Sequence, residues 1–313
     1  MNAKMYSVAI RRRLNDKDHF WQHDDYEFVD CKIDTCNGRY WYADPFVYEK
    51  DGVVYLFFEA LDLVQVKGIL GYCILREDGT CTKPKMIIEE HCHLSFPYIF
   101  EHEGSIYIMP EMCGDYSLTL FKAISFPDKW EKTIAVLPDV YACDSIFIEK
   151  GCERYLLTNE MYHHVPHGQY ASCWVKNYLY SMDGLKVLDH GTWVAEGDYG
   201  IRNAGKSFVE DGIVYRIGQD CRDKKYGRGL VLFKVSSLMP YSEEEVWSAT
   251  CDDITCHIKR NSENRLLGVH TYNFSEHFEI IDYSEMRHLA FRYEITRKID
   301  LIRRGWKKIV SYL

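Results

Sequence analysis

Acidic side chains recur at two fixed places of a repeated sequence pattern, and carboxylates grouped in this way can perform acid–base chemistry or bind a cation. The pattern is a small or acidic residue, a short apolar strand, a turn, and a second strand that ends in a polar residue. It occurs in residues 44–59, 96–111, 144–160, 204–219 and 255–270. The first end of each copy carries Asp44, Phe96, Asp144, Ala204 or Thr255, and the second end carries Glu59, Glu111, Glu160, Gln219 or His270.

Two carboxyl groups that flank a glycosidic bond are the minimum for glycoside chemistry, because one protonates the leaving oxygen and the other acts as base or nucleophile. Asp44 and Asp144 are candidates for the base or nucleophile, and Glu111 or Glu160 for the acid. A single carboxylate at a strand end is more often a solvated residue or a cap for backbone amides. The prediction therefore depends on five carboxylates converging on one place.

Further polar residues border the same strand ends and complete a predicted substrate-binding set. Arg202, just before the fourth copy, can hold a phosphate or carboxylate through two parallel hydrogen bonds. His93, just before the second copy, is as well explained by a structural role as by ligand binding. The predicted substrate-binding residues are Glu59, His93, Arg202, Gln219, Asp220, Tyr226 and His270. No dedicated metal ligands are predicted, although a divalent cation is compatible with the carboxylates and His270 can help to hold it or a water molecule.

Each copy of the pattern predicts a β-hairpin, because residues rich in Val, Ile, Tyr and Phe flank a turn. Strand-like runs such as 69–75 and 118–124 lie between the copies, so each unit supplies about four strands, the content of one propeller blade. The sequence therefore predicts an all-β protein with a five-bladed β-propeller in residues 1–290, in which the first 43 residues close the ring by pairing with the last blade. A pair of β-sandwiches is the alternative, but it does not predict five hairpins of matching register.

The C-terminal residues 291–313 have the pattern of a basic amphipathic helix. Apolar residues at helical spacing are Ile295, Ile299, Ile302, Trp306, Ile309, Val310 and Leu313. Such a helix can lie on an anionic membrane surface, or pack on the propeller with its basic face in water.

Composition excludes several classes of protein. A net charge of -9 disfavours nucleic-acid binding, which needs clustered Lys and Arg. No signal-peptide pattern and no apolar run of about 18 residues occurs, so we expect a cytoplasmic protein, with peripheral attachment to the inner face of the membrane through the C-terminal helix. The 12 cysteines are scattered without zinc-site spacing, which predicts reduced thiols.

Several motifs in the same order resemble a known family. These are Ala43-Asp-Pro-Phe46, Tyr55-Leu-Phe-Phe-Glu59, His93-Leu-Ser-Phe-Pro97, Met109-Pro-Glu111, Phe126-Pro-Asp-Lys-Trp130 and Asp144-Ser-Ile-Phe147. From roughly residue 40 to 245, the chain resembles the N-terminal domain of glucosamine inositolphosphorylceramide transferases, whose bacterial stand-alone relatives have surface-polysaccharide functions. That family is similar in fold to the five-bladed furanosidase clan, and Asp44-Pro45 matches the Asp-Pro motif on the first blade of that clan. The general acid of the clan has no unambiguous counterpart here, so Glu111 and Glu160 both stay open.

Three functions follow from the motifs and the resemblance. The first is a glycosyltransferase of surface polysaccharide or glycolipid biosynthesis that moves a sugar from an activated donor, a nucleotide sugar, to a lipid-linked glycan. In that reading Asp44 is the base or nucleophile, Asp144 tunes the pKa of the acid, and Arg202 binds the donor. No nucleotide-binding motif is visible, and the plant proteins carry a separate glycosyltransferase domain that this sequence does not contain. The alternatives are a furanosidase-like glycoside hydrolase and a non-catalytic propeller that binds a glycan.

Overall fold

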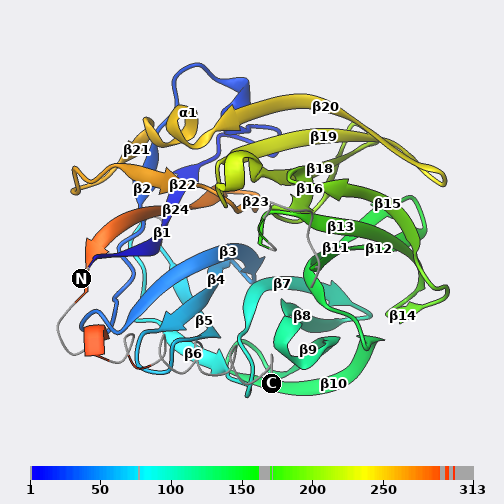
Figure 1. Ribbon diagram of the computed structural model, residues 1–313, viewed down its shortest axis with the longest axis horizontal. Helices are drawn as coiled ribbons and strands as arrows, with labels where there is room; N and C mark the ends of the chain where they lie inside the picture. The colour runs from blue at the N-terminus through cyan, green and yellow to red at the C-terminus, as the bar shows by residue number, and fades with distance from the viewer. Residues whose placement is uncertain are drawn as a thin grey trace, which may run out of the picture.

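The computed structural model describes residues 2–76, 78–161, 170, 172–289, 293–295 and 299, which form five β-sheets around a common axis (Figure 1). The first blade contains β3 (Tyr40–Lys50), β4 (Val53–Asp62), β5 (Lys67–Leu75) and β6 (Lys85–Ile88). The second contains β7 (Ser95–His102), β8 (Ser105–Glu111), β9 (Ser117–Ser125) and β10 (Lys129–Pro138). The third contains β11 (Ala142–Lys150), β12 (Glu153–Met161), β13 (Val175–Asp183), β14 (Lys186–Val187) and β15 (Thr192–Gly197).

The last two blades have a divided inner strand. In the fourth blade, β16 (Tyr199–Asn203) and β17 (Phe208–Glu210) both pair with β18 (Ile213–Asp220), followed by β19 (Gly229–Leu238) and β20 (Tyr241–Thr250). In the fifth, β22 (Leu266–Gly268) and β23 (Tyr272–Phe274) pair with β24 (Phe278–His288), followed by β1 (Asn2–Arg12), β2 (Phe28–Asp30) and β21 (Ile258–Lys259). The described helices are α1 (Cys251–Thr255) and the 3-10 turns Phe20–Gln22, Cys113–Asp115 and Arg222–Lys224, and residues 293–295 are also helical. The predicted all-β, five-bladed propeller is confirmed.

The N-terminal strand closes the ring, as predicted. β1 pairs antiparallel with β24 along its whole length, from Asn2 opposite His288 to Arg12 opposite Phe278. The first residues of the chain thus complete the last blade, which places them beside the first blade in Figure 1.

The fifth predicted hairpin, residues 255–270, is wrong. Thr250 caps α1, because its side chain accepts a hydrogen bond from the Asp253 backbone and its own backbone amide donates to the Asp253 carboxylate. This capping box makes Thr255 the last residue of a helix instead of the first residue of a strand. The inner hairpin of the blade is formed by β23 and β24, which places Thr271 where Thr255 was expected.

A bulge occurs at the same place in the inner strands of the first three blades. Asp44, Phe96 and Asp144 have φ values of 48°, 47° and 43°, and the pairing register shifts at each of them. A left-handed conformation is strained for residues other than glycine, and a bulge changes the direction in which a side chain points. The fold therefore maintains three strained residues, of which Asp44 and Asp144 make polar contacts near the axis, whereas Phe96 packs in the core against Phe46.

The C-terminal prediction falls largely outside the described residues. Of the expected helix over 291–313, only 293–295 and 299 are described. Tyr293 is buried in a small cluster with Ala3, Met5, Leu63 and Leu289. Within the described part of the chain, no helix has the length and apolar character needed to cross a membrane.

Candidate active site

Polar side chains from all five blades meet near the axis, in a group that we call the axial cluster. Its members are Asp44, Glu59, His93, Glu111, Asp144, Arg202, Gln219, Tyr226, His270, Thr271 and Asp282. Nine of these were predicted from the sequence, and Thr271 and Asp282 were not.

An aspartate–histidine–aspartate group forms the part of the axial cluster between the first and fifth blades. The ring nitrogens of His270 lie 3.0 Å from Oδ1 of Asp44 (Nε2) and 2.9 Å from Oδ2 of Asp282 (Nδ1). The hydroxyl of Thr271 donates to Oδ1 of Asp44 at 2.8 Å, and the Phe96 backbone amide donates to Oδ2 at 3.1 Å. Asp282 is fully buried and accepts the backbone amides of His270 and Thr271 at 3.0 and 3.1 Å.

The charges in this group oppose the effect of burial. Burial alone would lower the pKa of His270, but Asp282 and Asp44 raise it to about 10. Burial alone would raise the pKa of Asp44, but His270 and the donors Thr271 and Phe96 hold it below its usual value. Nδ1 of His270 is not aligned for a hydrogen bond to Asp282, so their attraction is mainly between opposite charges. Near neutral pH, the group is an imidazolium held between two carboxylates.

A second group joins the second, third and fourth blades through one arginine. The guanidinium of Arg202 donates through Nε to Oδ2 of Asp144, and its Nη2 lies 3.3 Å from Oε2 of Glu111. The amide of Gln219 also donates to Asp144, at 3.3 Å. Burial and the nearby Glu111 raise the pKa of Asp144, whereas the positive charge of Arg202 lowers it. The net result is a raised pKa. One guanidinium facing two carboxyl groups can balance only one negative charge, which agrees with the raised pKa of Asp144.

The third group, Glu59 with His93, lies at the more open edge of the axial cluster. Nε2 of His93 lies 3.2 Å from Oε1 of Glu59, and the backbone amide of Gly68 donates to Nδ1 at 2.9 Å. The His93 side chain is 46% exposed, whereas that of Glu59 is 7% exposed. Oε1 of Glu59 is buried without an aligned donor, and burial raises the pKa of this carboxyl group. Glu59 therefore accepts a proton more readily than an ordinary carboxylate does.

Tyr226 connects the arginine group to the histidine group. Its ring centre lies 5.1 Å from the guanidinium carbon of Arg202 and 5.0 Å from the ring centre of His270. Tyr6 contacts His270 edge-on, with ring centres 4.9 Å apart. These two aromatic rings supply apolar contacts next to the charged groups.

Two predicted site residues lie outside the axial cluster. In the third blade Cys143 pairs with Asn159, as Ala43 pairs with Glu59 in the first, so Asn159 occupies the place expected for Glu160. The third copy of the repeat is one residue longer, which turns Glu160 to the other face of β12, where it accepts from the Tyr180 hydroxyl at 3.3 Å.

Asp220 is the second of these residues. It follows Gln219 on β18 and therefore points away from the axis. It accepts from Nε and Nη2 of Arg222 at 3.0 and 2.9 Å, which makes it a structural ion pair.

The two missed residues have a common explanation. Thr271 and Asp282 face each other across β23 and β24, where the Asp282 amide donates to the Thr271 carbonyl at 3.3 Å. A fifth repeat that began at Thr271 instead of Thr255 would have shown Asp282 on its second strand. The sequence signal existed, but the misplaced hairpin concealed it.

Two sets of donor atoms in or beside the axial cluster are spaced for a cation. Asp44, His270 and Asp282 offer ligand atoms within 4.8 Å of one another, and so do Glu111, Cys143 and Asp144. In the first set His270 already lies between the two carboxyl groups, and in the second Arg202 already contacts both acidic residues. A metal ion would have to replace these charges.

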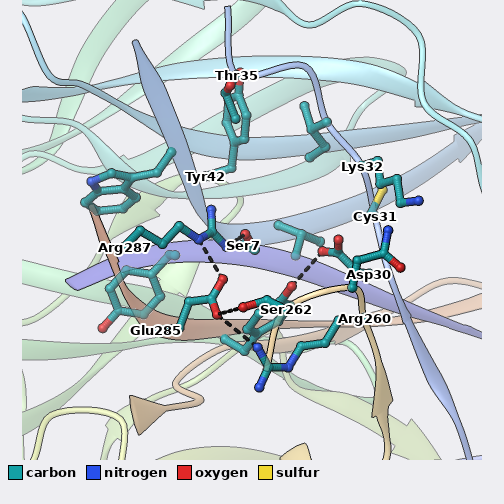
Figure 2. Close-up of a pocket in the computed structure, with 16 residues that line it drawn as sticks. Ser7, Asp30, Cys31, Lys32, Thr35, Tyr42, Arg260, Ser262, Glu285 and Arg287 are labelled. Carbon is teal, nitrogen blue, oxygen red and sulfur yellow. Dashed lines mark hydrogen bonds and ion pairs between the residues drawn. The ribbon is translucent and has the colours of Figure 1, made fainter. Parts of the chain in front are cut away.

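A pocket of about 370 Å³ lies next to the axial cluster, between the fifth and first blades (Figure 2). Glu285 is held in it by Arg260 at 2.9 Å, by Arg287 at 2.6 Å and by the Ser262 hydroxyl at 2.8 Å. Asp30 accepts from the Tyr283 hydroxyl at 2.7 Å, and Lys32, Trp41 and Tyr42 complete the wall. Tyr6 lines this pocket and also contacts His270, so its side chain connects the pocket wall to the axial cluster.

Comparison with known proteins agrees with these features. Residues 28–274 match the family model described as glucosamine inositolphosphorylceramide transferase 1, N-terminal. The chain belongs to this family. It is 31% identical over 246 residues to glucosamine inositolphosphorylceramide transferase 1 of Arabidopsis thaliana, covering 74% of this chain and 30% of that protein. A protein of the same name from Oryza sativa subsp. japonica is 30% identical over 208 residues, covering 65% and 27%. The chain thus spans about 30% of the length of these relatives.

Solved structures with a similar fold are glycoside hydrolases. A thermostable family-43 glycoside hydrolase has a TM-score of 0.53 at 9% identity, covering 80% of this chain and 90% of that one. An α-L-arabinofuranosidase from Lactobacillus brevis has a TM-score of 0.52 at 13% identity, covering 75% and 80%. The endo-arabinase of Bacteroides thetaiotaomicron has a TM-score of 0.52 at 12% identity, covering 80% and 95%. At these identities the likeness concerns the fold, and it agrees with the expected relation to the furanosidase clan.

Proposed function

We propose that the protein transfers a sugar from an activated donor to a glycolipid acceptor, with the axial cluster as the reaction site. The family supports the reaction class, since the curated relatives are named glucosamine inositolphosphorylceramide transferases. The observation that carries the proposal is that buried carboxyl groups with opposite pKa shifts meet in one site: the pKa of Asp44 is lowered, whereas those of Glu59 and Asp144 are raised. Titratable groups driven apart in this way are typical of acid and base partners in one site.

Glu111 is the proposed acid. It belongs to the axial cluster, unlike Glu160, and its side chain is 11% exposed whereas that of Asp144 is 3% exposed. Substrate therefore reaches Glu111 more readily than Asp144. Arg202 contacts both Glu111 and Asp144, and the proposed role of Asp144 and Arg202 is to position the carboxyl group of Glu111.

Asp44 is the proposed stabiliser of positive charge at the reacting sugar. Its lowered pKa and its contacts with Thr271, Phe96 and His270 make it a weak base. An ionised carboxylate suits an oxocarbenium-like transition state. Glu59, with its raised pKa and an oxygen without an aligned donor, is the better candidate for the base.

We propose that the donor phosphate binds in the neighbouring pocket and not at Arg202. Arg202 is buried and already engaged by Asp144 and Glu111. The pocket carries Lys32, Arg260 and Arg287 against Asp30 and Glu285, which leaves an excess of one positive charge by subtraction. A donor that bound there would have its sugar directed past Tyr6 toward the axis.

A furanosidase-type hydrolase is the second candidate, favoured by the Asp44-Pro45 motif on the first blade. The test is product analysis by mass spectrometry after incubation with nucleotide sugars and a glycolipid acceptor, and separately with furanoside oligosaccharides. Transfer should fall at least about 100-fold in Glu111→Gln, the usual scale for loss of a general acid. Glu160→Gln is the matched control, and its rate should stay within about twofold of the original protein. Hydrolysis of furanosides without any transfer would replace the proposal by the hydrolase.

A further inference from the structure

Three cysteines lie together at the seam between the first and last blades. Sγ of Cys31 is 2.9 Å from Sγ of Cys81, and the Cys73 thiol hydrogen-bonds to Cys81 as well. Cys31 follows β2 of the fifth blade, Cys73 lies on β5 of the first blade, and Cys81 bridges to Leu75 at the end of β5. Figure 2 shows Cys31 in the wall of the pocket between these blades.

We propose that Cys31 and Cys81 form a disulfide that closes the propeller covalently, with Cys73 as a competing partner for Cys81. The ring is otherwise closed by the pairing of β1 with β24, and the Cys31 amide is tied to this strand through the Val8 carbonyl at 2.8 Å. A Cys31–Cys81 bond would attach the closing segment of the last blade to the first blade. It spans 50 residues, so it would greatly restrict the unfolded chain.

The accessibility of the three thiols indicates which of them reacts first. Cys81 is partly exposed, whereas Cys31 and Cys73 are buried. Hydrogen bonds from the Cys31 and Cys73 thiols lower the pKa of Cys81, which favours its thiolate, and Arg76 acts in the same direction. The exposed thiolate is the nucleophile in exchange with an external disulfide.

Oxidation by glutathione disulfide balances in two exchanges. The Cys81 thiolate attacks one sulfur of glutathione disulfide, and one glutathione thiolate leaves. Cys31 then loses its proton and attacks the Cys81 sulfur of the mixed disulfide, and the second glutathione leaves as a thiolate. The two protons lost by the protein thiols are taken up by the two glutathiones, so two protein thiols are oxidised and one glutathione disulfide is reduced.

A second thiol pair provides an internal comparison. Cys173 and Cys221 also hydrogen-bond to each other, but both are buried. Without an exposed sulfur, neither can begin the exchange. We expect this pair to stay reduced under conditions that oxidise Cys31 and Cys81.

The test is disulfide mapping of the full chain after equilibration with oxidised glutathione, by acid quenching, thiol alkylation and mass spectrometry of a non-reduced digest. A Cys31–Cys81 peptide should appear, and the melting temperature should rise by about 5 °C over the reduced protein. Cys73→Ser should keep both results, whereas Cys31→Ser should lose most of the rise and divert Cys81 to Cys73. Cys251→Ser, a buried cysteine whose sulfur contacts Thr255, controls for the loss of a core thiol and should keep the Cys31–Cys81 bond.

Three results would contradict the proposal. Cys31 recovered as the alkylated thiol after oxidation would overturn it, and so would a Cys73–Cys81 bond as the main product in the original sequence. A Cys31–Cys81 bond that left the melting temperature unchanged would overturn its role in closing the ring.

Discussion

Replacing Asp282 by asparagine should move the pKa of a histidine that is nowhere near the protein surface. His270 has a pKa of about 10, against 6.5 for the free side chain, and Asp282 is its strongest charged partner. At about 1.4 kcal/mol per pKa unit, the folded protein holds this proton on the order of 5 kcal/mol more tightly than the unfolded chain does. Since the folded pKa is the higher one, this stabilisation is complete below pH 6.5 and is lost as the pH rises to about 10.

Asp282→Asn keeps an oxygen for the backbone amides but removes the charge. The pKa of His270 should fall by about two units, and the free energy of unfolding at pH 7 by about 3 kcal/mol, the scale for breaking a buried ion pair. The assay is NMR of ¹³C-labelled histidine across a pH titration, together with urea unfolding. Asp62→Asn is the control: Asp62 is equally buried but pairs with Arg39, so its loss should destabilise the fold without moving His270.

The reasoning on His270 would be refuted by the histidine titration itself. The chain has 13 histidines, and one signal should remain protonated at pH values where exposed imidazoles have titrated. If all signals titrate near the ordinary value of about 6.5, the buried imidazolium does not exist. If Asp282→Asn leaves the late titration unchanged, Asp282 is not its cause.

Three further substitutions test the surroundings of the axial cluster. Gly68→Ala should cost about 2 kcal/mol in urea unfolding and disturb Glu59, because a Cβ atom there would lie 2.4 Å from the Leu94 carbonyl and 2.8 Å from Oε1 of Glu59. Arg202→Met should cost about 3–5 kcal/mol at pH 7, since it removes the cation that contacts Glu111 and Asp144, and the loss should shrink as the pH falls and Asp144, whose pKa is raised, becomes protonated. Arg287→Gln should weaken nucleotide-sugar binding about tenfold by calorimetry while leaving the His270 titration unchanged; equal affinity would remove the pocket from the donor site.

The arrangement of blades was readable from the sequence because each hairpin repeats the same alternation of apolar and polar residues. The alternation has a period of two, and the four copies that are hairpins in the structure already leave few folds other than a propeller. Ring closure by the first strand was predicted because the first 43 residues precede the first repeat and were available to pair with the last blade. These features depend on local pattern, which a single sequence displays directly.

The predictions were wrong where a local structural feature changes the register of a strand. The capping box at Thr250 converts an expected strand start into helix α1, and the longer third hairpin places Asn159 where Glu160 was expected. A shift of one residue reverses the face on which a side chain lies. The bulges at Asp44 and Asp144 were also invisible, because nothing in their residue type demands a positive φ. Such register changes depend on pairing between strands, which the sequence alone does not show.

The most direct test of sugar transfer at the axial cluster is ligand-observed NMR of the purified protein with a panel of nucleotide sugars. The account predicts that one donor shows saturation transfer to its sugar protons, that Glu111→Gln reduces this signal, and that Glu160→Gln leaves it unchanged. If no nucleotide sugar binds while furanoside oligosaccharides do, the transferase is contradicted and the site belongs to a hydrolase or to a glycan-binding propeller.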